Sequence, residues 1–278
     1  MQFRGFIVGP ERSGTTLTAA YLSTHKDVYV INDPHYLNFF LPLLAESLGE
    51  DKVKISDLGS SFLLAKTWKN LLLKALQNTK AWYERWEEFH GDPVQPELFY
   101  SSAEYLLEEP SISVANYFHK FYLSLIPNEI KSRKAFYLVK LPDLGRMLPL
   151  TRLFYNESPI IYNIRHPILN IASIILPNED RGWSFPQIVH WYKLFFPPEI
   201  LEKNVPNLFF SRYEDLMLSS SKGQTNCLLE YLKIQSDEKS LSKNFEYPNK
   251  KVMRKTKGKL DVNRVIQSFD LLSPKDFQ

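Results

Sequence analysis

The segment from Phe6 to Leu22, FIVGPERSGTTLTAAYL, constrains the fold more than any other part of the chain. A short apolar run leads through a Gly-Pro turn and a small polar loop into a segment of helical character. Phosphate-binding loops have this arrangement, because the first N–H groups of a helix have no partner inside the helix and can bind an anion. Gly9 and Gly14 also have four residues between them, as in such a loop. The segment therefore predicts an α/β protein with an anion-binding loop.

The cation of this loop is not where a nucleoside-triphosphate site needs it. In those sites a Lys follows the second Gly and reaches the β- and γ-phosphates, whereas Thr15 stands there in this chain. The cation of the loop is Arg12, two residues before Gly14. We expect the backbone N–H groups of residues 13–16 to point at the anion, and the hydroxyls of Ser13, Thr15 and Thr16 to add donors.

Alternation of strands and helices predicts the rest of the architecture. Five short apolar runs are rich in β-branched and aromatic residues, and longer helical stretches separate them. This pattern favours a three-layer fold in which helices flank a parallel sheet on both faces. We expect one domain over residues 1–278. The predicted strands are Phe3–Val8, Val28–Ile31, Phe136–Val139, Ile160–Ile164 and Leu208–Phe210.

A large helical insertion, about residues 36–131, separates the second and third predicted strands. Its clearest helix has one apolar face, as expected for a helix that packs on a core. An insertion of this size is a candidate for shaping a ligand pocket, and plain helical packing is the alternative for any one of its residues. The residues of the apolar face are Leu64, Trp68, Leu71, Leu72 and Ala75.

Composition narrows the class of protein. The 278 residues are 44% hydrophobic, which is enough for a sizeable core, and the net charge of +3 does not by itself imply nucleic acid. The single cysteine, Cys227, cannot form an intrachain disulfide and fits a reducing compartment. No apolar run approaches the roughly 18–20 residues of a membrane span, and the first strand begins almost at Met1. We therefore expect a cytoplasmic protein without a membrane span or nucleic-acid partner, or a domain of a larger protein.

A second motif, IIYNIRHPILNIAS, covers Ile160 to Ser173. A buried strand ends at Arg165, His166 and Pro167 form a turn, and Ser173 follows on the next helix, eight residues after Arg165. Ligands of open α/β sheets bind at the carboxyl ends of the strands. An arginine there can grip a phosphate with two hydrogen bonds, and a serine can donate to the same group.

Together, GPERSGTTL and RHPILNIAS resemble the two cofactor signatures of sulfotransferases that use 3′-phosphoadenosine 5′-phosphosulfate (PAPS). The first resembles the loop for the 5′-phosphosulfate, and the second resembles the 3′-phosphate site formed by Arg165 and Ser173. This donor has no γ-phosphate, which accounts for the missing lysine. By this resemblance Arg12 contacts the bridging oxygen and the transferring group. The resemblance implies PAPS as donor, its product 3′,5′-bisphosphoadenosine (PAP) and no metal.

The segment RSGTTLTAAYLSTHKDVYVINDPH resembles the start of the tyrosylprotein-type and related bacterial sulfotransferases. In that group an acidic residue just after the second strand, usually Glu, serves as general base on the acceptor. The corresponding residue is Asp33, whose side chain is one methylene shorter, and reach matters at hydrogen-bond range. His35 is therefore the second candidate for the base. A turn or capping role for Asp33 is the third interpretation.

Three further segments resemble parts of the same family. FYLVKLP resembles the third strand, which implies that Lys140 neutralises the transferring sulfonate. LFFSRYEDL resembles the block in which a tyrosine, here Tyr213, lies near the adenine, although a core tyrosine is an equal alternative. In the basic run of residues 250–259, RKTKG with Lys255 faintly resembles a flap over the cofactor, and a solvated tail is the usual alternative. Trp183, which follows the 3′-phosphate motif, is a candidate for stacking on the adenine.

The resemblance implies an enzyme that moves a sulfonate group from PAPS to a hydroxyl or amine by in-line transfer with a general base. The acceptor is a small molecule, a glycan, a lipid or a peptide, and the helical insertion would shape its pocket. Two other functions are compatible with the residues. One is a P-loop nucleotide kinase or hydrolase, against which the missing lysine argues. The other is a catalytically silent member that binds the nucleotide.

Overall fold

The computed structural model describes residues 1–49, 66–85, 96–108, 113–178, 185–196, 206–217 and 222–235. Within these residues the fold is built on a sheet of five parallel strands in the order β2-β3-β1-β4-β5, which confirms the predicted α/β class. β2, β3 and β5 extend one or two residues beyond the prediction, because pairing continues between Asn32 and Lys140 and between Ile164 and Arg212. The strands are β1 (Gln2–Val8), β2 (Val28–Asn32), β3 (Phe136–Lys140), β4 (Ile160–Ile164) and β5 (Leu208–Arg212).

The strand order determines where a ligand can bind. After β1 the chain passes through α1 (Thr15–Ser23) to β2 at one edge of the sheet, and after β4 it passes through α8 (Pro167–Asn178) and α9 (Phe185–Lys193) to β5 at the other edge. β1 and β4 are neighbours, so their following loops diverge at the carboxyl edge of the sheet. Such a divergence is the usual ligand site of an open α/β sheet. Both signature motifs lie on these two loops.

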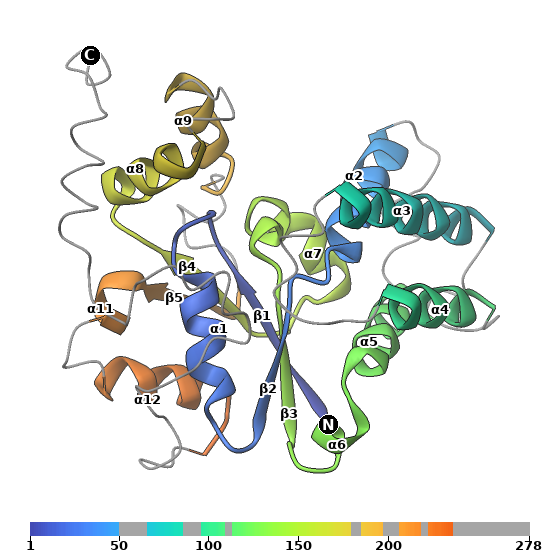
Figure 1. Ribbon diagram of the computed structural model, residues 1–278, viewed down its shortest axis with the longest axis horizontal. Helices are drawn as coiled ribbons and strands as arrows, with labels where there is room; N and C mark the ends of the chain where they lie inside the picture. Colours follow the sequence, from blue (N-terminus) through green and yellow to red (C-terminus); the bar gives the residue numbers. More distant parts are fainter. Residues whose placement is uncertain are drawn as a thin grey trace.

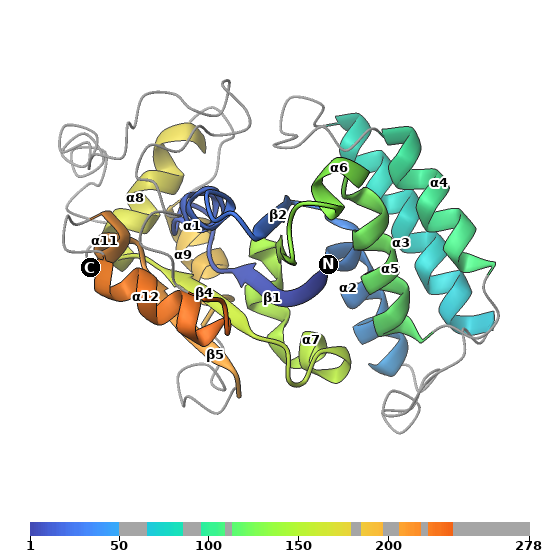
Figure 2. The same cartoon turned by 90° about the horizontal axis from the view of Figure 1, so that it is seen from below.

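The two faces of the sheet pack on different helices, because side chains alternate along each strand. Phe6 and Val8 join the core cluster that contains the insertion helices, whereas Ile7 joins the cluster that contains residues of α1 and of α12 (Lys222–Tyr231). This division produces the three predicted layers. Figure 1 shows the strands between the two groups of helices, and Figure 2 shows the same groups from below.

The insertion between β2 and β3 is helical, as predicted. On the predicted apolar face of α3, Trp68, Leu72 and Ala75 are buried and Leu71 is partly buried, while Leu64 lies outside the described residues. Ser113 starts α5 as an N-cap, because its Oγ accepts a hydrogen bond from the N–H of Asn116 at 3.2 Å. The insertion helices are α2 (Tyr36–Gly49), α3 (Lys66–Arg85), α4 (Pro96–Leu107), α5 (Val114–Leu125) and α6 (Asn128–Lys131).

Three short helices complete the described part of the chain. The 3₁₀ helix η3 follows β3 directly and leads into α7, and α11 follows β5 directly. η3 and α11 therefore begin at the carboxyl edge of the sheet, beside the signature loops. Their bounds are η3 (Pro142–Met147), α7 (Leu148–Phe154) and α11 (Tyr213–Met217). Among the described residues, no helix is long and apolar enough to span a bilayer.

Candidate active site

The loop between β1 and α1 has two positions, Gly9 and Gly14, whose backbone conformation favours glycine. Gly9 has a φ of 141° and Gly14 has a φ of 101°, a region that L side chains rarely adopt. Both glycines are also in close contact with their neighbours. A Cβ on Gly9 would lie 2.3 Å from the backbone oxygen of Asn163, and a Cβ on Gly14 would lie 2.7 Å from Cδ2 of Tyr213. The loop is thus held between the ends of β4 and β5.

The helix that follows the loop presents free donors to its N-terminal side. The first helical hydrogen bond runs from the N–H of Thr18 to the oxygen of Gly14 at 2.9 Å, so the N–H groups of residues 15–17 have no helical acceptor. No side chain caps this end. The N–H of Ser13 differs from our expectation, because it donates to the oxygen of Pro10 at 3.1 Å and closes the loop instead. The Oγ of Ser13 is buried and has no hydrogen-bond partner among the described residues.

The two signature motifs are in direct contact. Nε of Arg12 donates to Oγ of Ser173 at 3.3 Å, and Nη1 of Arg165 donates to the backbone oxygen of Arg12 at 3.4 Å. One turn before Ser173 on α8, Nδ2 of Asn170 donates to the oxygen of Glu11 at 3.2 Å. Sequence reasoning overlooked Asn170, although its spacing from Ser173 places both on one helical face. The start of α8 therefore holds the backbone of the first loop.

Tyr213 links the same two motifs from the side of β5. The guanidinium carbon of Arg165 lies 4.5 Å from the centroid of the Tyr213 ring, which is a cation–π contact. The ring also lies against Gly14, where a side chain would displace it, because an added Cβ would be 2.7 Å from Cδ2 of Tyr213. Tyr213 thus supports both the arginine and the loop. A role beside an adenine stays a prediction.

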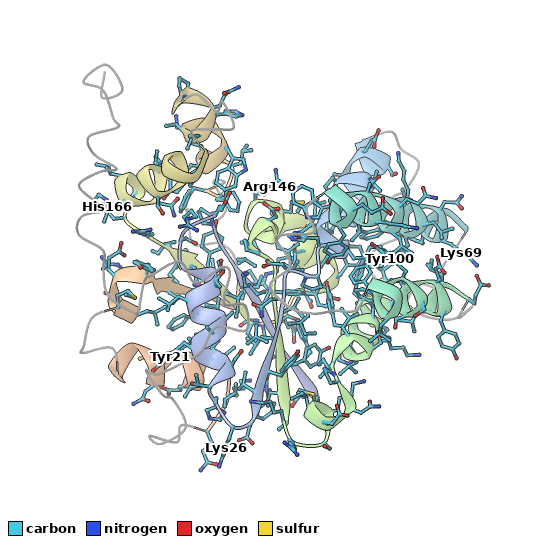
Figure 3. All side chains as sticks on the ribbon, viewed as in Figure 1. Tyr21, Lys26, Lys69, Tyr100, Arg146 and His166 are labelled. Carbon is cyan, nitrogen blue, oxygen red and sulfur yellow. The ribbon has the colours of Figure 1, made fainter. Side chains whose placement is uncertain are left out.

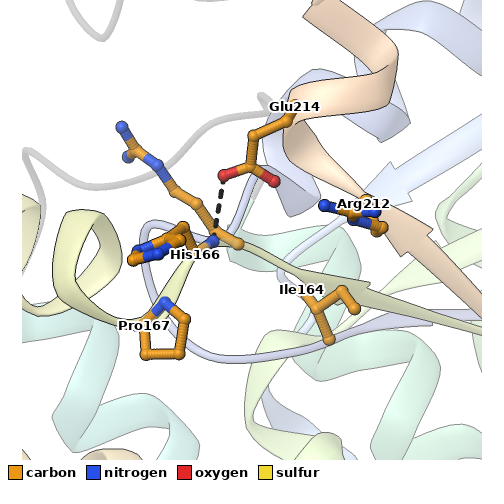
Figure 4. Close-up of a pocket in the computed structure, with 6 residues that line it drawn as sticks. Ile164, His166, Pro167, Arg212 and Glu214 are labelled. Atoms are coloured by element: carbon orange, nitrogen blue, oxygen red, sulfur yellow. Dashed lines mark hydrogen bonds between the residues drawn. The ribbon is translucent and has the colours of Figure 1, made fainter.

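A pocket of about 230 Å³ opens beside Arg165 (Figure 4). It is lined by the end of β4 and the turn after it, together with Arg212 and Glu214 from β5 and α11. Oε1 of Glu214 accepts a hydrogen bond from the N–H of His166 at 2.9 Å, which fixes the turn that follows Arg165. Sequence reasoning did not select Glu214, because only the sheet order brings α11 next to this turn.

A second group of polar residues lies at the ends of β2 and β3. Lys140 pairs with Asn32 in the β2–β3 ladder and with Ile7 in the β1–β3 ladder, so this residue lies at the end of β3 between the ends of β1 and β2. Nζ of Lys140 forms an ion pair of 2.5 Å with Oδ2 of Asp33. The lysine side chain is 6% exposed and the aspartate side chain is 24% exposed. The pair therefore stands at the boundary between the core and solvent.

Backbone contacts hold Asp33 in place. Its φ is 49°, in the left-handed region where Asp is tolerated, and its N–H donates to the oxygen of Lys140 at 2.9 Å. The hydroxyl of Tyr83 on α3 donates to the backbone oxygen of Asp33 at 3.2 Å. Burial raises the pKa of Tyr83 above its ordinary value, so this hydroxyl remains a donor at neutral pH.

His35 has a different hydrogen-bond arrangement. Nδ2 of Asn38 lies 3.2 Å from Nδ1 of His35, and an amide nitrogen can only donate. Nδ1 of His35 is thus engaged with Asn38, just as Oδ2 of Asp33 is engaged with Lys140, so each candidate for the base is held by a neighbouring side chain.

The two signature loops and the Asp33–Lys140 pair all lie at the carboxyl edge of the sheet. Figure 3 shows His166 at the start of α8 and Arg146 on η3 at this edge, and Lys26 at the opposite one. Lys255 and Trp183 lie outside the described residues. Among the described residues, no group of three or more His, Cys, Asp or Glu side chains could hold a metal ion.

Comparisons with known proteins show which family and which fold the chain resembles. A family model described as "Sulfotransferase family" matches residues 6–238. The sulfotransferase domain of the Synechococcus PCC 7002 olefin synthase aligns over 98% of this chain and 89% of its own, with a TM-score of 0.56 and 16% identity, a likeness of fold.

Two mycobacterial sulfotransferases also align. STF9 from Mycobacterium avium covers 97% of this chain and 75% of its own, with a TM-score of 0.47 and 12% identity. STF1 from Mycobacterium tuberculosis H37Rv covers 98% and 77%, with a TM-score of 0.46 and 14% identity. A sequence search among curated proteins finds no significant match.

Proposed function

The chain belongs to the sulfotransferase family, and from that premise we propose that it transfers a sulfonate group from PAPS to a hydroxyl or amine of an acceptor. We propose further that residues 1–278 form a single sulfotransferase domain.

The contact between the two signature motifs is the observation that carries this proposal. A donor with a phosphosulfate at one end and a 3′-phosphate at the other needs both anion sites within one molecule's reach. Arg12 on the first loop touches Ser173 on the second motif, and Arg165 touches the backbone of Arg12. In the described part of the chain the buried Oγ of Ser13 lacks a hydrogen-bond partner, and the close approach at Gly9 shapes the loop, so the residues present fit an anionic ligand.

Each residue has a role that its position supports. The N–H groups at the start of α1 and the guanidinium of Arg12 stabilise the charge that develops on the leaving 5′-phosphate. Arg165 and Ser173 bind the 3′-phosphate. Lys140 balances the sulfonate oxygens. Catalysis by such groups depends on positioning and charge, as in phosphoryl transfer.

Asp33 is proposed as the general base. Its carboxylate takes the proton of the acceptor hydroxyl or amine while the acceptor atom forms a bond to sulfur. The bond between sulfur and the bridging oxygen breaks, and its electron pair stays on the 5′-phosphate. His35, whose Nδ1 lies 3.2 Å from Nδ2 of Asn38, is the second candidate for the base.

Nucleotide binding by calorimetry tests the donor assignment. The protein should bind PAP without magnesium and much more tightly than adenosine 5′-phosphate. Arg165→Ala should remove most of the preference for PAP, and Arg133→Ala, which deletes an exposed arginine outside both motifs, should leave it unchanged. Equal loss of both nucleotides in Arg165→Ala would make Arg165 structural, and binding of ATP with magnesium in place of PAP would favour a kinase or hydrolase. Transfer of radiolabelled sulfonate to an acceptor panel separates an enzyme from a silent binder.

A further inference from the structure

Three aromatic side chains, His35, Phe39 and Trp82, form a cluster beside Asp33, which we call the aromatic cluster. The ring centroid of Trp82 lies 5.7 Å from that of His35 and 6.0 Å from that of Phe39. His35 and Phe39 are one helical turn apart, since the N–H of Phe39 donates to the oxygen of His35 at 3.3 Å. Trp82 comes from the last turn of α3. Two insertion helices therefore meet here.

The cluster is open to solvent on one side. Trp82 is 38% exposed, while His35 and Phe39 are half-buried. A single exposed aromatic residue is ordinary on a protein surface. Trp82 differs from an ordinary exposed aromatic residue in its position. One of the two rings that it contacts belongs to His35, two residues after the proposed base. An aromatic ring that packs on Trp82 would remove apolar surface from water and gain the favourable geometry of ring pairs.

The position of the cluster relative to Asp33 is fixed by two contacts. Tyr83, next to Trp82 in the sequence, donates its hydroxyl to the backbone oxygen of Asp33 at 3.2 Å. Nδ2 of Asn38 lies 3.2 Å from Nδ1 of His35, which holds the imidazole beside Trp82. The end of α3 is thus attached to the end of β2. A ligand that packs on Trp82 would therefore lie near His35, two residues after the proposed base.

We propose that the acceptor is an aromatic alcohol or amine whose ring packs on Trp82 while its hydroxyl or amino group reaches Asp33. This inference rests on the sulfonate transfer proposed above. The apolar face of the cluster matches a ring, and the carboxylate of Asp33 matches the single polar group attached to it. A sugar would bring several hydroxyls against the carbon faces of Trp82 and Phe39, which offer them no hydrogen bonds, at the cost of their hydration.

Binding of 2-naphthol, measured by calorimetry, tests the proposal without requiring turnover. It is titrated into the protein alone and into the protein saturated with PAP. Trp82→Ala should weaken 2-naphthol binding about tenfold or more, whereas Trp82→Phe, which keeps a ring, should restore most of the affinity. Tyr105→Ala, which removes a side chain that is 75% exposed on α4, is the matched control and should bind like the natural sequence. PAP affinity should be the same in all four proteins.

Two results with 2-naphthol would overturn the proposal, and a third comes from a saturated analogue. One is absence of 2-naphthol binding to the natural sequence, and the other is equal affinity in Trp82→Ala and Tyr105→Ala. The saturated analogue 2-decalol should bind about three- to tenfold more weakly than 2-naphthol, and equal binding would remove the aromatic requirement. Failure of the natural sequence to bind PAP would instead count against the donor assignment, so the two proposals fail by different measurements.

Discussion

Replacing Gly9 with alanine tests whether the first loop depends on the close approach of β1 and β4. Alanine there must adopt a φ of 141°, and a sparsely populated backbone conformation costs about 1–3 kcal/mol. Its Cβ would lie 2.3 Å from the oxygen of Asn163, so that backbone must withdraw by roughly 1 Å to reach ordinary contact. Overpacking of this kind costs about 1–3 kcal/mol. The free energy of unfolding should therefore fall by about 2–6 kcal/mol.

Thermal unfolding followed by circular dichroism measures this loss. For a chain of this size about 1 kcal/mol lowers Tm by roughly 2–4 °C, so a decrease of about 5–20 °C is expected. Gly49→Ala is the matched control, because nothing lies within 4 Å of its added Cβ and its φ is not in the positive range. At the end of α2 alanine should be neutral or stabilise by up to about 1 kcal/mol. Equal Tm values for Gly9→Ala and Gly49→Ala would refute the reasoning.

Two further predictions concern charged groups of the site. Asp33→Asn should lower turnover roughly a hundredfold or more without weakening PAP binding, because the amide cannot take a proton. If that variant keeps its activity while His35→Gln loses it, the base is His35. Glu214→Gln keeps an acceptor for the N–H of His166 and removes a negative charge beside Arg165, so PAP should bind about two- to fivefold more tightly. Weaker binding in a calorimetric titration of that variant would contradict this electrostatic account.

The fold could be predicted from local sequence patterns, which can be recognised without knowing tertiary contacts. Buried parallel strands are short apolar runs, so all five were predicted, and their extra residues depend on partners that the sequence does not specify. The position of Lys140 also depends on a partner strand that the sequence does not specify. Its pairing with Asn32 requires β2 and β3 to be neighbours.

The site was predictable at the level of motifs, but its contacts were not. The two signature motifs were expected to serve one ligand, and the structure places Arg12 against Ser173. The ion pair of Asp33 with Lys140 and the hydrogen bond from Asn38 to His35 were not foreseen, because side-chain pairing depends on sheet order and rotamers. The use of the Ser13 N–H inside the loop could not be predicted either, because it depends on where α1 begins.

The strand order also affects how the chain can fold during synthesis. β1 is synthesised before β3 and β4, which are its neighbours in the sheet. Ser173, which contacts Arg12, is synthesised 161 residues after it. At ribosomal rates this gap lasts roughly 8–30 s. The emerging first loop therefore lacks the contacts that shape it until most of the chain has left the ribosome. The central strand β1 must therefore be kept from wrong partners until β3 and β4 have been made.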